Sequence, residues 1–348
     1  MRKRVLFISP RISNMYQDIM SQLARWDMEV DYIEDKTNRY DPNYLRSDFL
    51  FFTDNCCWKK IYSNTVKKGW IELLSHYPYN KAYDYLLIID GQNLHPYLFD
   101  ELRKRNPHIW IANYLYDSTK SLYRFQENFK QFDRIASFDK QDCREFGLSF
   151  LPIYWCEPGD TSSVDYDLFG FGGYGPERYA LFTEIDLISK SLGFNSFIKL
   201  YFPKIKDVER FIFKQKVRRI LRMNTHINMS HYYSDLITHN SLPSSEFRRL
   251  IYQSKIIIDS VNFYQDGMTA RFMWALGAGK KILTTNANIK NYECYDPNQI
   301  FVLNDLKNIS ANKDFLNFLM TDYLMKQSRI NRLLPWRIDN WLIFLLNI

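Results

Sequence analysis

The sequence contains few cysteines, and their spacing argues against the two structures that cysteines most often build. There are five, with one adjacent pair and no CxxC: Cys56, Cys57, Cys143, Cys156 and Cys294. An odd number without that spacing argues against a disulfide framework and against a zinc site. Reduced thiols are typical of cytosolic proteins, so we expect a cytoplasmic location.

Long apolar stretches are also missing. No run approaches the ~18 apolar residues that indicate a membrane-spanning helix. The run Val5–Ile8 after the basic start is too short for a signal-peptide core. We therefore expect no spanning segment. The aromatic, basic end of the chain, residues 333–348, favours either packing on the first domain or peripheral attachment to the inner face of the cytoplasmic membrane.

Several cofactor and metal motifs are absent as well. The first expected turn, Ser9-Pro10-Arg11, lacks GxGxxG, and no P-loop, GxSxG or HExxH occurs. The six histidines are scattered without ligand spacing. Asp165-Tyr166-Asp167 matches a DxD metal motif, but it falls at an expected linker and such matches arise by chance in a chain of this length. We expect neither a bound metal nor a cofactor.

The charge balance is only mildly basic. The net charge is +7 and the pI is about 8.9, which suits anionic ligands such as nucleotide diphosphates. Nucleic-acid-binding motifs are not found, so we expect no nucleic-acid partner. Aromatic residues make up 17% of the chain. Most aromatic rings fill protein cores, and some stack on sugar or base rings.

Apolar runs alternate with helical patterns along the chain, which predicts doubly wound α/β domains. At 348 residues the chain has room for two. We place a linker at Glu157–Asp165, an acceptor-side domain at 1–158, a donor-side domain at 159–314 and a helical tail at 315–348. In the first domain, strands are expected at Val5–Ile8, Val30–Ile33, Tyr85–Ile89, Ile109–Leu115 and Arg134–Phe138, with helices at Asn14–Trp26, Tyr62–His76, Pro96–Arg105 and Gln141–Phe146.

The second domain shows the same alternation and one informative stretch, residues 255–286. There an apolar run ends at Asp259, a polar loop follows, and an amphipathic segment from Met268 closes at Gly277-Ala278-Gly279 before a second apolar run. This pattern predicts a βαβ unit whose helix N-terminus faces the carboxyl end of a strand, where anions bind well. Before it we expect elements at Leu168–Phe171, Glu177–Leu192, Phe197–Phe202, Val208–Arg222 and Ser245–Gln253, the last capped by Ser244, and after it a strand at Ile300–Leu303.

The 255–286 stretch resembles the donor-site segment of bacterial group-1 glycosyltransferases of GT-B fold, in particular polysaccharide-biosynthesis members and their CgeB-like relatives. The resemblance lies in Asp266-Gly267 and in the turn from Trp274 through Ala275, Leu276, Gly277 and Ala278 to Gly279. Retaining members carry two Glu eight positions apart. Asp266 stands for the first of them, whereas Trp274 replaces the second and cannot accept a ribose hydroxyl through a carboxylate.

The resemblance implies two Rossmann-like domains facing a cleft, with a terminal helix that crosses back to the first domain. It implies metal-independent transfer from a nucleotide-sugar donor to a saccharide acceptor, including a lipid-linked one, in capsule, lipopolysaccharide or other surface-glycan assembly. Two alternatives stay open. One is a sugar-nucleotide epimerase of the same fold, and the other is a non-catalytic nucleotide- or glycan-binding partner of an assembly complex.

The candidate donor-binding residues surround the two expected anion-binding turns. Gly172 and Gly173 form part of a Gly-rich turn between a strand and a helix, where glycine lets the backbone approach a pyrophosphate. Arginines one turn into the following helices can pair with diphosphate oxygens; the alternative for Arg178 is an ordinary surface arginine, and for Arg271 a salt bridge with a nearby acid. The full set is Gly172, Gly173, Arg178, Gln265, Gly267, Thr269 and Arg271, with helix capping the alternative role for Thr269.

The candidate catalytic residues are carboxylates at strand ends. An inverting transfer needs a base for the acceptor hydroxyl, and Asp117 and Asp90 each follow an expected strand of the first domain. Asp117 is our first choice and Asp90 the second, with helix capping or loop hydrogen bonding as the structural alternative for each. Asp266 is the third candidate, by its place in the resemblance.

Overall fold

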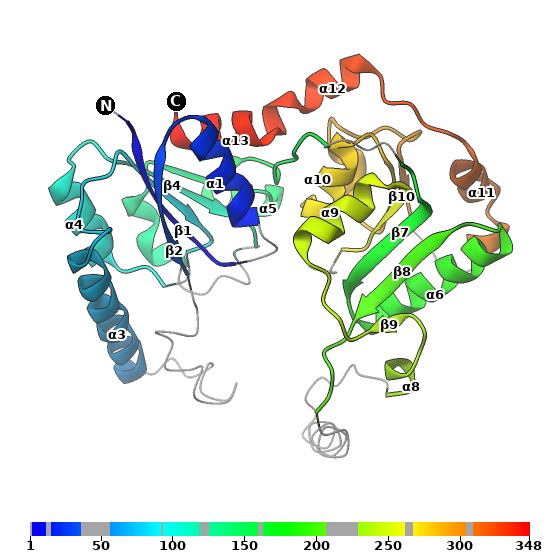
Figure 1. Cartoon of the computed structure of the whole chain (residues 1–348), viewed down its shortest axis with the longest axis horizontal. Helices are drawn as coiled ribbons and strands as arrows, with labels where there is room; N and C mark the ends of the chain where they lie inside the picture. Colours follow the sequence, from blue (N-terminus) through cyan, green and yellow to red (C-terminus); the bar gives the residue numbers. More distant parts are fainter. Residues whose placement is uncertain are drawn as a thin grey trace. The chain divides into compact units, whose positions relative to one another are not determined.

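A computed structural model shows the arrangement of the chain (Figure 1). It describes residues 2–11, 15–35, 56–91, 93–117, 119, 125–158, 163–206, 229–261, 267–303 and 309–348. The chain divides into two compact units. The first is built mainly from residues up to Tyr154 together with Pro335–Ile348, and the second from Trp155–Tyr264 and Met268–Leu334.

The first unit contains a six-stranded sheet in the order β2-β1-β3-β4-β5-β6, with every pair parallel. Its strands are β1 (Arg4–Ser9), β2 (Glu29–Glu34), β3 (Tyr85–Ile89), β4 (Trp110–Leu115), β5 (Arg134–Ser137) and β6 (Ser149–Phe150). The helical elements are α1 (Met15–Arg25), α3 (Cys56–Ser75), α4 (Pro96–Arg105), η1 (Phe125–Gln131) and α5 (Lys140–Phe146). All five strands predicted from the apolar runs are present.

Continuous apolar strands follow from burial on both faces of a parallel sheet. Leu6 and Ile8 of β1 face a core formed with residues of α3 and α4, such as Trp70 and Leu98. Phe7, between them, is also fully buried. A strand exposed on one face would instead show alternating polar residues, which β1 does not.

The last helix of the chain, α13 (Ile338–Leu346), packs with the first unit. Trp341 is fully buried and donates its indole N–H to the carbonyl of Pro152 at 3.0 Å. From the sheet, Trp110 donates to the carbonyl of Leu345 at 2.9 Å. The prediction that the terminal helix returns to the first domain is therefore confirmed, and this packing accounts for the burial of Trp341.

The second unit contains another six-stranded parallel sheet, in the order β12-β11-β10-β7-β8-β9. The strands are β7 (Tyr166–Gly173), β8 (Ser196–Tyr201), β9 (Ile237–Thr238), β10 (Ser254–Asp259), β11 (Lys281–Thr284) and β12 (Ile300–Val302). The helical elements are α6 (Pro176–Ser191), α8 (Met229–Tyr232), α9 (Ser244–Tyr252), α10 (Ala270–Gly277), η2 (Ala287–Asn291), η3 (Ile309–Ala311), α11 (Lys313–Met320) and α12 (Gln327–Leu333). The short helix η4 (Leu334–Trp336) follows at the boundary between the two units.

Helices cover both faces of this second sheet. Leu168 of β7 belongs to a core shared with α6 and α11, whereas its neighbour Phe169 contacts Phe247 of α9 on the other face. Gly170 fits this packing, because a Cβ there would lie 2.8 Å from Ile258. With α/β units of this kind in both halves, the two-domain fold predicted from the sequence is confirmed.

One local prediction was wrong, and another is not tested. Ser244 is the first residue of α9 and the cap position belongs to Pro243, which provides no side-chain cap, so Ser244 does not cap the helix. The helix expected at Val208–Arg222 lies outside the described residues. In the described part of the chain, no helix has both the length and the apolar character needed to cross a membrane.

Candidate functional site

The carboxyl edge of the second sheet is organised around Asp259, the last residue of β10. Its side chain is 1% exposed. One carboxylate oxygen, Oδ1, accepts a 2.7 Å hydrogen bond from Thr269, and Oδ2 accepts a 3.1 Å bond from Thr284 of β11. A buried carboxylate held this way ties the end of β10 to the next strand and to the start of α10.

Two arginines converge on the same strand end. Arg271 of α10 lies 3.8 Å from Asp259 Oδ1 and donates to the carbonyl of Ile258 at 3.2 Å. Arg178 of α6 donates from Nε to the hydroxyl of Ser260 at 2.6 Å and from a terminal nitrogen to the carbonyl of Gly173 at 2.5 Å. We call Arg178, Arg271, Asp259 and Ser260 the arginine site.

The charges at the arginine site do not cancel. Burial lowers the pKa of both guanidinium groups, the nearby charge of Arg178 lowers the pKa of Arg271 further, and Asp259 partly offsets both effects. Two cations therefore share one buried carboxylate. In addition, Arg271 Nε is buried and makes no hydrogen bond within the described residues. An excess of desolvated positive charge with a free donor is the environment that stabilises an anion.

Two helix N-termini lie at this edge. Thr269 is the N-cap of α10, because its hydroxyl accepts the N–H of Phe272 at 3.1 Å. The N-cap of α6 is Gly175, which provides no side-chain cap, and the helix begins with Pro176, which has no N–H group to donate. Gly172 gives Arg178 room: a Cβ there would lie 3.3 Å from the arginine Cδ. Gly173 follows as an exposed residue whose carbonyl accepts from Arg178.

The structure places the remaining donor-side candidates as follows. Gln265 and Asp266 lie outside the described residues, and Gly267 is buried just before the cap of α10. Trp274, which replaces the second Glu of the resembling family, is 2% exposed and packs edge-on against Phe247 at 6.1 Å between ring centroids. Its ring serves the packing between α9 and α10, and Arg248 lies over it at 4.9 Å.

Sequence reasoning passed over the residues that hold the arginine site together. In the sequence, Asp259 marks only the end of an apolar strand, and Ser260 and Thr284 belong to no recognisable site motif. An available signal was the position of these polar residues directly after, or at the end of, neighbouring apolar strands. In a parallel sheet those ends meet at one edge.

The first sheet brings the candidate bases Asp90 and Asp117 together at its own carboxyl edge. Asp90 follows β3, is 2% exposed and has a φ of 58°, in the left-handed region. Its Oδ1 accepts the backbone N–H groups of Tyr116 at 2.7 Å and of Asp117 at 3.3 Å. Asp117 follows β4 and is half-buried. Asp90 thus fixes the backbone that presents Asp117.

Burial makes both carboxyl groups weaker acids than usual. The pKa of Asp90 is raised to about 7, first by burial and then by the charge of Asp117, against the lowering effect of its two N–H donors. Burial also raises the pKa of Asp117. A carboxylate with a raised pKa is a stronger base, and a general base must accept a proton.

Two other acids near this edge have structural roles. Asp139 caps α5, because its side chain accepts the N–H groups of Gln141 and Asp142. Asp142 in turn accepts from the backbone and hydroxyl of Thr119, at 2.8 and 2.7 Å. Within the described ranges, no group of three or more His, Cys, Asp or Glu side chains is arranged to hold a metal ion.

Comparisons with known proteins identify the fold. The chain is similar to the apo structure of OtsA, with a TM-score of 0.54 and 13% identity, covering 99% of this chain and 100% of that one. It is similar to α,α-trehalose 6-phosphate synthase from Burkholderia multivorans, with a TM-score of 0.54 and 11% identity over 99% and 98%. A UDP-N-acetylglucosamine 2-epimerase from Rickettsia bellii is less similar, at a TM-score of 0.34 and 10% identity over 74% of each chain, and supports no conclusion about function.

No protein-family model and no curated protein sequence matches the chain. The resemblance to CgeB-like and polysaccharide-biosynthesis glycosyltransferases therefore stays a prediction. At the level of architecture the structures agree: this chain has the two-domain α/β fold of GT-B glycosyltransferases such as OtsA.

Proposed function

We propose that this chain is a glycosyltransferase that moves a sugar from a nucleotide-sugar donor to a saccharide acceptor. The single observation that carries the proposal is the arginine site, where two partly buried guanidinium groups share one buried carboxylate at the carboxyl edge of a parallel sheet. A nucleoside diphosphate is a ligand of matching charge, and this edge is where ligands of open α/β sheets bind.

Charge stabilisation would be the main catalytic contribution of the arginine site. When the bond between the anomeric carbon and the diphosphate breaks, negative charge builds up on the leaving oxygen. Arg271 and Arg178 are cations held at this strand end by their hydrogen bonds, and they would stabilise this charge with little reorganisation. The proposed chemistry uses the chain's own cations and N–H groups and calls on no metal ion.

The proton of the acceptor hydroxyl has two routes. With inversion, the acceptor oxygen bonds to the anomeric carbon while Asp117 takes the hydroxyl proton, and Asp90 acts as a positioning residue through the loop it holds. With retention, the departing diphosphate takes the proton. The raised pKa of Asp117 favours the first route, because it makes the carboxylate a better base.

The acceptor follows from the sequence resemblance alone. We infer a saccharide acceptor of surface-glycan assembly, either free or linked to a lipid at the inner face of the cytoplasmic membrane. Because α13 packs with the first unit, the tail's tryptophan Trp341 is occupied in the core. A lipid-linked acceptor would therefore bring the enzyme to the membrane, rather than this side chain.

A donor panel tests the proposal. Purified protein is screened by thermal shift against UDP, GDP, ADP, TDP and CMP, and any nucleotide that stabilises it is then supplied as its sugar conjugates with saccharide acceptors. Release of the nucleoside diphosphate together with a glycosylated product supports the transferase. An epimerised sugar nucleotide would assign the epimerase alternative, and stabilisation without any turnover would assign the non-catalytic partner. No stabilisation by any nucleotide overturns the proposal.

A further inference from the structure

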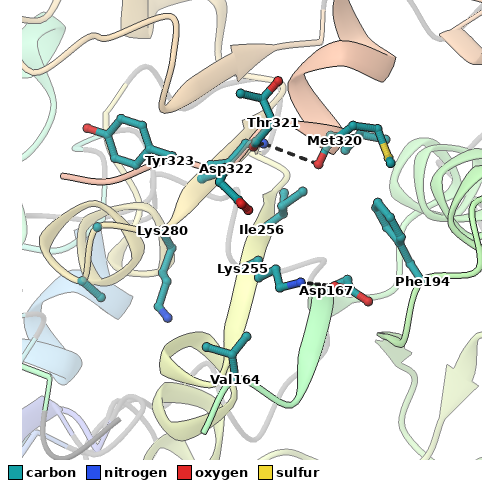
Figure 2. Close-up of a pocket in the computed structure, with 14 residues that line it drawn as sticks. Val164, Asp167, Phe194, Lys255, Ile256, Lys280, Met320, Thr321, Asp322 and Tyr323 are labelled. Atoms are coloured by element: carbon teal, nitrogen blue, oxygen red, sulfur yellow. Dashed lines mark hydrogen bonds and ion pairs between the residues drawn. The ribbon is translucent and has the colours of Figure 1, made fainter. Parts of the chain in front are cut away.

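A second charged pocket lies at the amino edge of the second sheet, the edge opposite the arginine site (Figure 2). Its volume is about 340 Å³. It is lined by residues at the start of β10, in the loop before β11 and in the segment after α11, including Lys255, Ile256, Lys280, Lys281 and Asp322, and by Phe194. A pocket of this size accommodates a small metabolite.

One lysine of this pocket is part of its wall. Lys281 is 5% exposed, and its ammonium donates to the carbonyls of Phe318 and Thr321 at the C-terminal end of α11. Burial lowers its pKa to about 8, partly offset by the charge of Asp322. A third, longer bond joins the ammonium to the carbonyl of Leu319 at 3.5 Å, so Lys281 holds the end of α11 against the sheet.

The other two lysines differ in their partners. Lys255 forms a 2.8 Å ion pair with Asp167. Lys280 is half-buried, burial lowers its pKa, and no hydrogen bond or ion pair of its ammonium is found in the described part of the chain. Figure 2 shows its side chain extending along the pocket. With three lysines against Asp167 and Asp322, the lining carries one excess positive charge.

The backbone fixes where Lys280 starts. Gly279, directly before it, has a φ of 66°, in the left-handed region that favours glycine. A Cβ at Gly279 would also lie only 3.2 Å from Met325 Cβ. This turn ends α10 and delivers Lys280 to the pocket at the first position after the helix stop. The Lys280 side chain therefore starts from a defined place on the pocket wall.

We propose that this amino-edge pocket binds a small phosphorylated metabolite, with its oxyanion on Lys280 and its apolar or ring portion against Phe194 and Ile256. A half-buried cation without a partner loses hydration and gains nothing in return, and an oxyanion supplies the missing interaction. The single excess charge and the small volume favour a compact phosphate ester over a dinucleotide or a polymer. Asp322 provides a carboxylate that accepts from ligand hydroxyls.

This pocket is separate from the arginine site. Both sites include residues of β10, but Lys255 is the second residue of this strand and Asp259 is the last. At ~3.3 Å per residue, four residues of strand place the two sites about 13 Å apart along β10. The proposal therefore does not depend on the proposed sugar transfer and can hold whether or not that function does.

The test measures binding directly. Calorimetric titrations use inorganic phosphate, glucose 6-phosphate and citrate as probes, on a protein carrying Arg178→Gln so that an oxyanion at the arginine site is disfavoured. We expect glucose 6-phosphate to bind, and Lys280→Met to weaken it at least tenfold while Lys280→Arg retains most of the affinity. Lys290→Met, an exposed lysine of the same unit, removes the same charge and should leave binding unchanged.

The binding results either support or overturn the proposed site. Tenfold tighter binding of glucose 6-phosphate than of phosphate supports a phosphorylated metabolite. Equal binding of all three probes, or an equal loss in the Lys280 and Lys290 variants, indicates general charge attraction and overturns the proposal. Absence of binding by every probe overturns it as well. Circular dichroism and melting temperature of each variant show that lost binding reflects the site rather than the fold.

Discussion

The hydroxyl of Thr269 donates a 2.7 Å hydrogen bond to Asp259 Oδ1 while it accepts the N–H of Phe272. One oxygen thus caps α10 and ties the helix to the buried end of β10. The same carboxylate oxygen lies 3.8 Å from Arg271. Thr269, Asp259 and Arg271 therefore form one connected group, and replacing any one of them should change the environment of the other two.

Replacing Thr269 by Val should destabilise the second unit. The substitution keeps the shape of the side chain but removes the cap, which costs about 1 kcal/mol, and leaves a buried acceptor on Asp259 without its donor, which costs about 1–3 kcal/mol more. Thr269→Ser keeps the hydroxyl and should behave close to wild type. Urea unfolding monitored by circular dichroism measures both, and equal stability of the Val and Ser variants would contradict the role given to this hydroxyl.

Removing either arginine should weaken nucleotide binding. Charge-assisted hydrogen bonds contribute about 1.5–3 kcal/mol, so Arg271→Gln and Arg178→Gln should each raise the Kd of the bound nucleoside diphosphate by roughly 10- to 100-fold. Arg249→Gln is the matched control, because Arg249 pairs with Glu246 on the exposed surface of α9.

The melting temperatures of Arg271→Gln and Arg178→Gln have to be measured alongside their nucleotide binding. Arg271→Gln leaves Asp259 without its nearest cation, whereas Arg178 contacts a hydroxyl and carbonyls, so the two variants should differ in melting temperature but agree in weakened binding. Wild-type affinity in both variants would remove the arginine site from donor recognition.

Replacing Asp117 should lower kcat more than replacing Asp90. If Asp117 is the base, Asp117→Asn should lower kcat by about 100-fold or more with little change in donor affinity. Asp90→Asn leaves an oxygen that can still accept the N–H groups of Tyr116 and Asp117, so its loss of kcat should be smaller. A pH–rate profile that still falls at low pH in the Asp117→Asn variant would assign the base elsewhere.

The sequence predicted most elements because each apolar strand carries its own local signal. The range Tyr85–Ile89 was predicted without error, and Ile256–Ile258 is the centre of β10. Parallel strands buried on both faces read as unbroken apolar runs, and Gly or Asp marks their ends. These signals need no knowledge of the partner strands, which is why they suffice for fold class.

The site was harder to predict because it depends on which strand ends become neighbours. Arg178 and Ser260 are 82 positions apart, and Asp259 and Thr284 are 25 apart. Nothing local marks Asp259 as the acceptor of two threonines, or Lys280 as a lysine without a partner. The sheet order β11-β10-β7 brings these residues together, and that order is a property of the whole fold.

The packing of the terminal helix can be tested by replacing one large side chain with alanine. Trp341 is fully buried against Tyr114, at 4.6 Å between ring centroids, so Trp341→Ala should destabilise the first unit by about 3–5 kcal/mol. Ile343→Ala on the same helix is the control, because Ile343 is 40% exposed and should change stability by less than about 1 kcal/mol. Hydrogen exchange of β4 amides measures the effect locally, and equal protection in both variants would show that α13 does not support this sheet.

The stability of the first unit should also depend on pH through Asp90. Its pKa is raised from 3.8 to about 7 in the folded state, so between about pH 4 and pH 7 the folded chain holds a proton that the unfolded chain has released. The contribution is therefore fully present below about pH 4 and is lost as pH rises through 7. A shift of this size corresponds to roughly 4 kcal/mol, at about 1.36 kcal/mol per unit.

Asp90→Asn removes the titrating group and should flatten this pH dependence. The difference in free energy of unfolding between variant and wild type should favour the variant much more at pH 8 than at pH 4. Urea unfolding at both pH values measures it. Asp100→Asn, an exposed residue of α4, should leave the wild-type slope intact. Asp117→Asn should lower the pH at which Asp90 titrates, because the charge of Asp117 raises the pKa of Asp90. Parallel curves for wild type and Asp90→Asn would show that Asp90 is already ionised across this range, and the coupling between the two carboxylates would have to be abandoned.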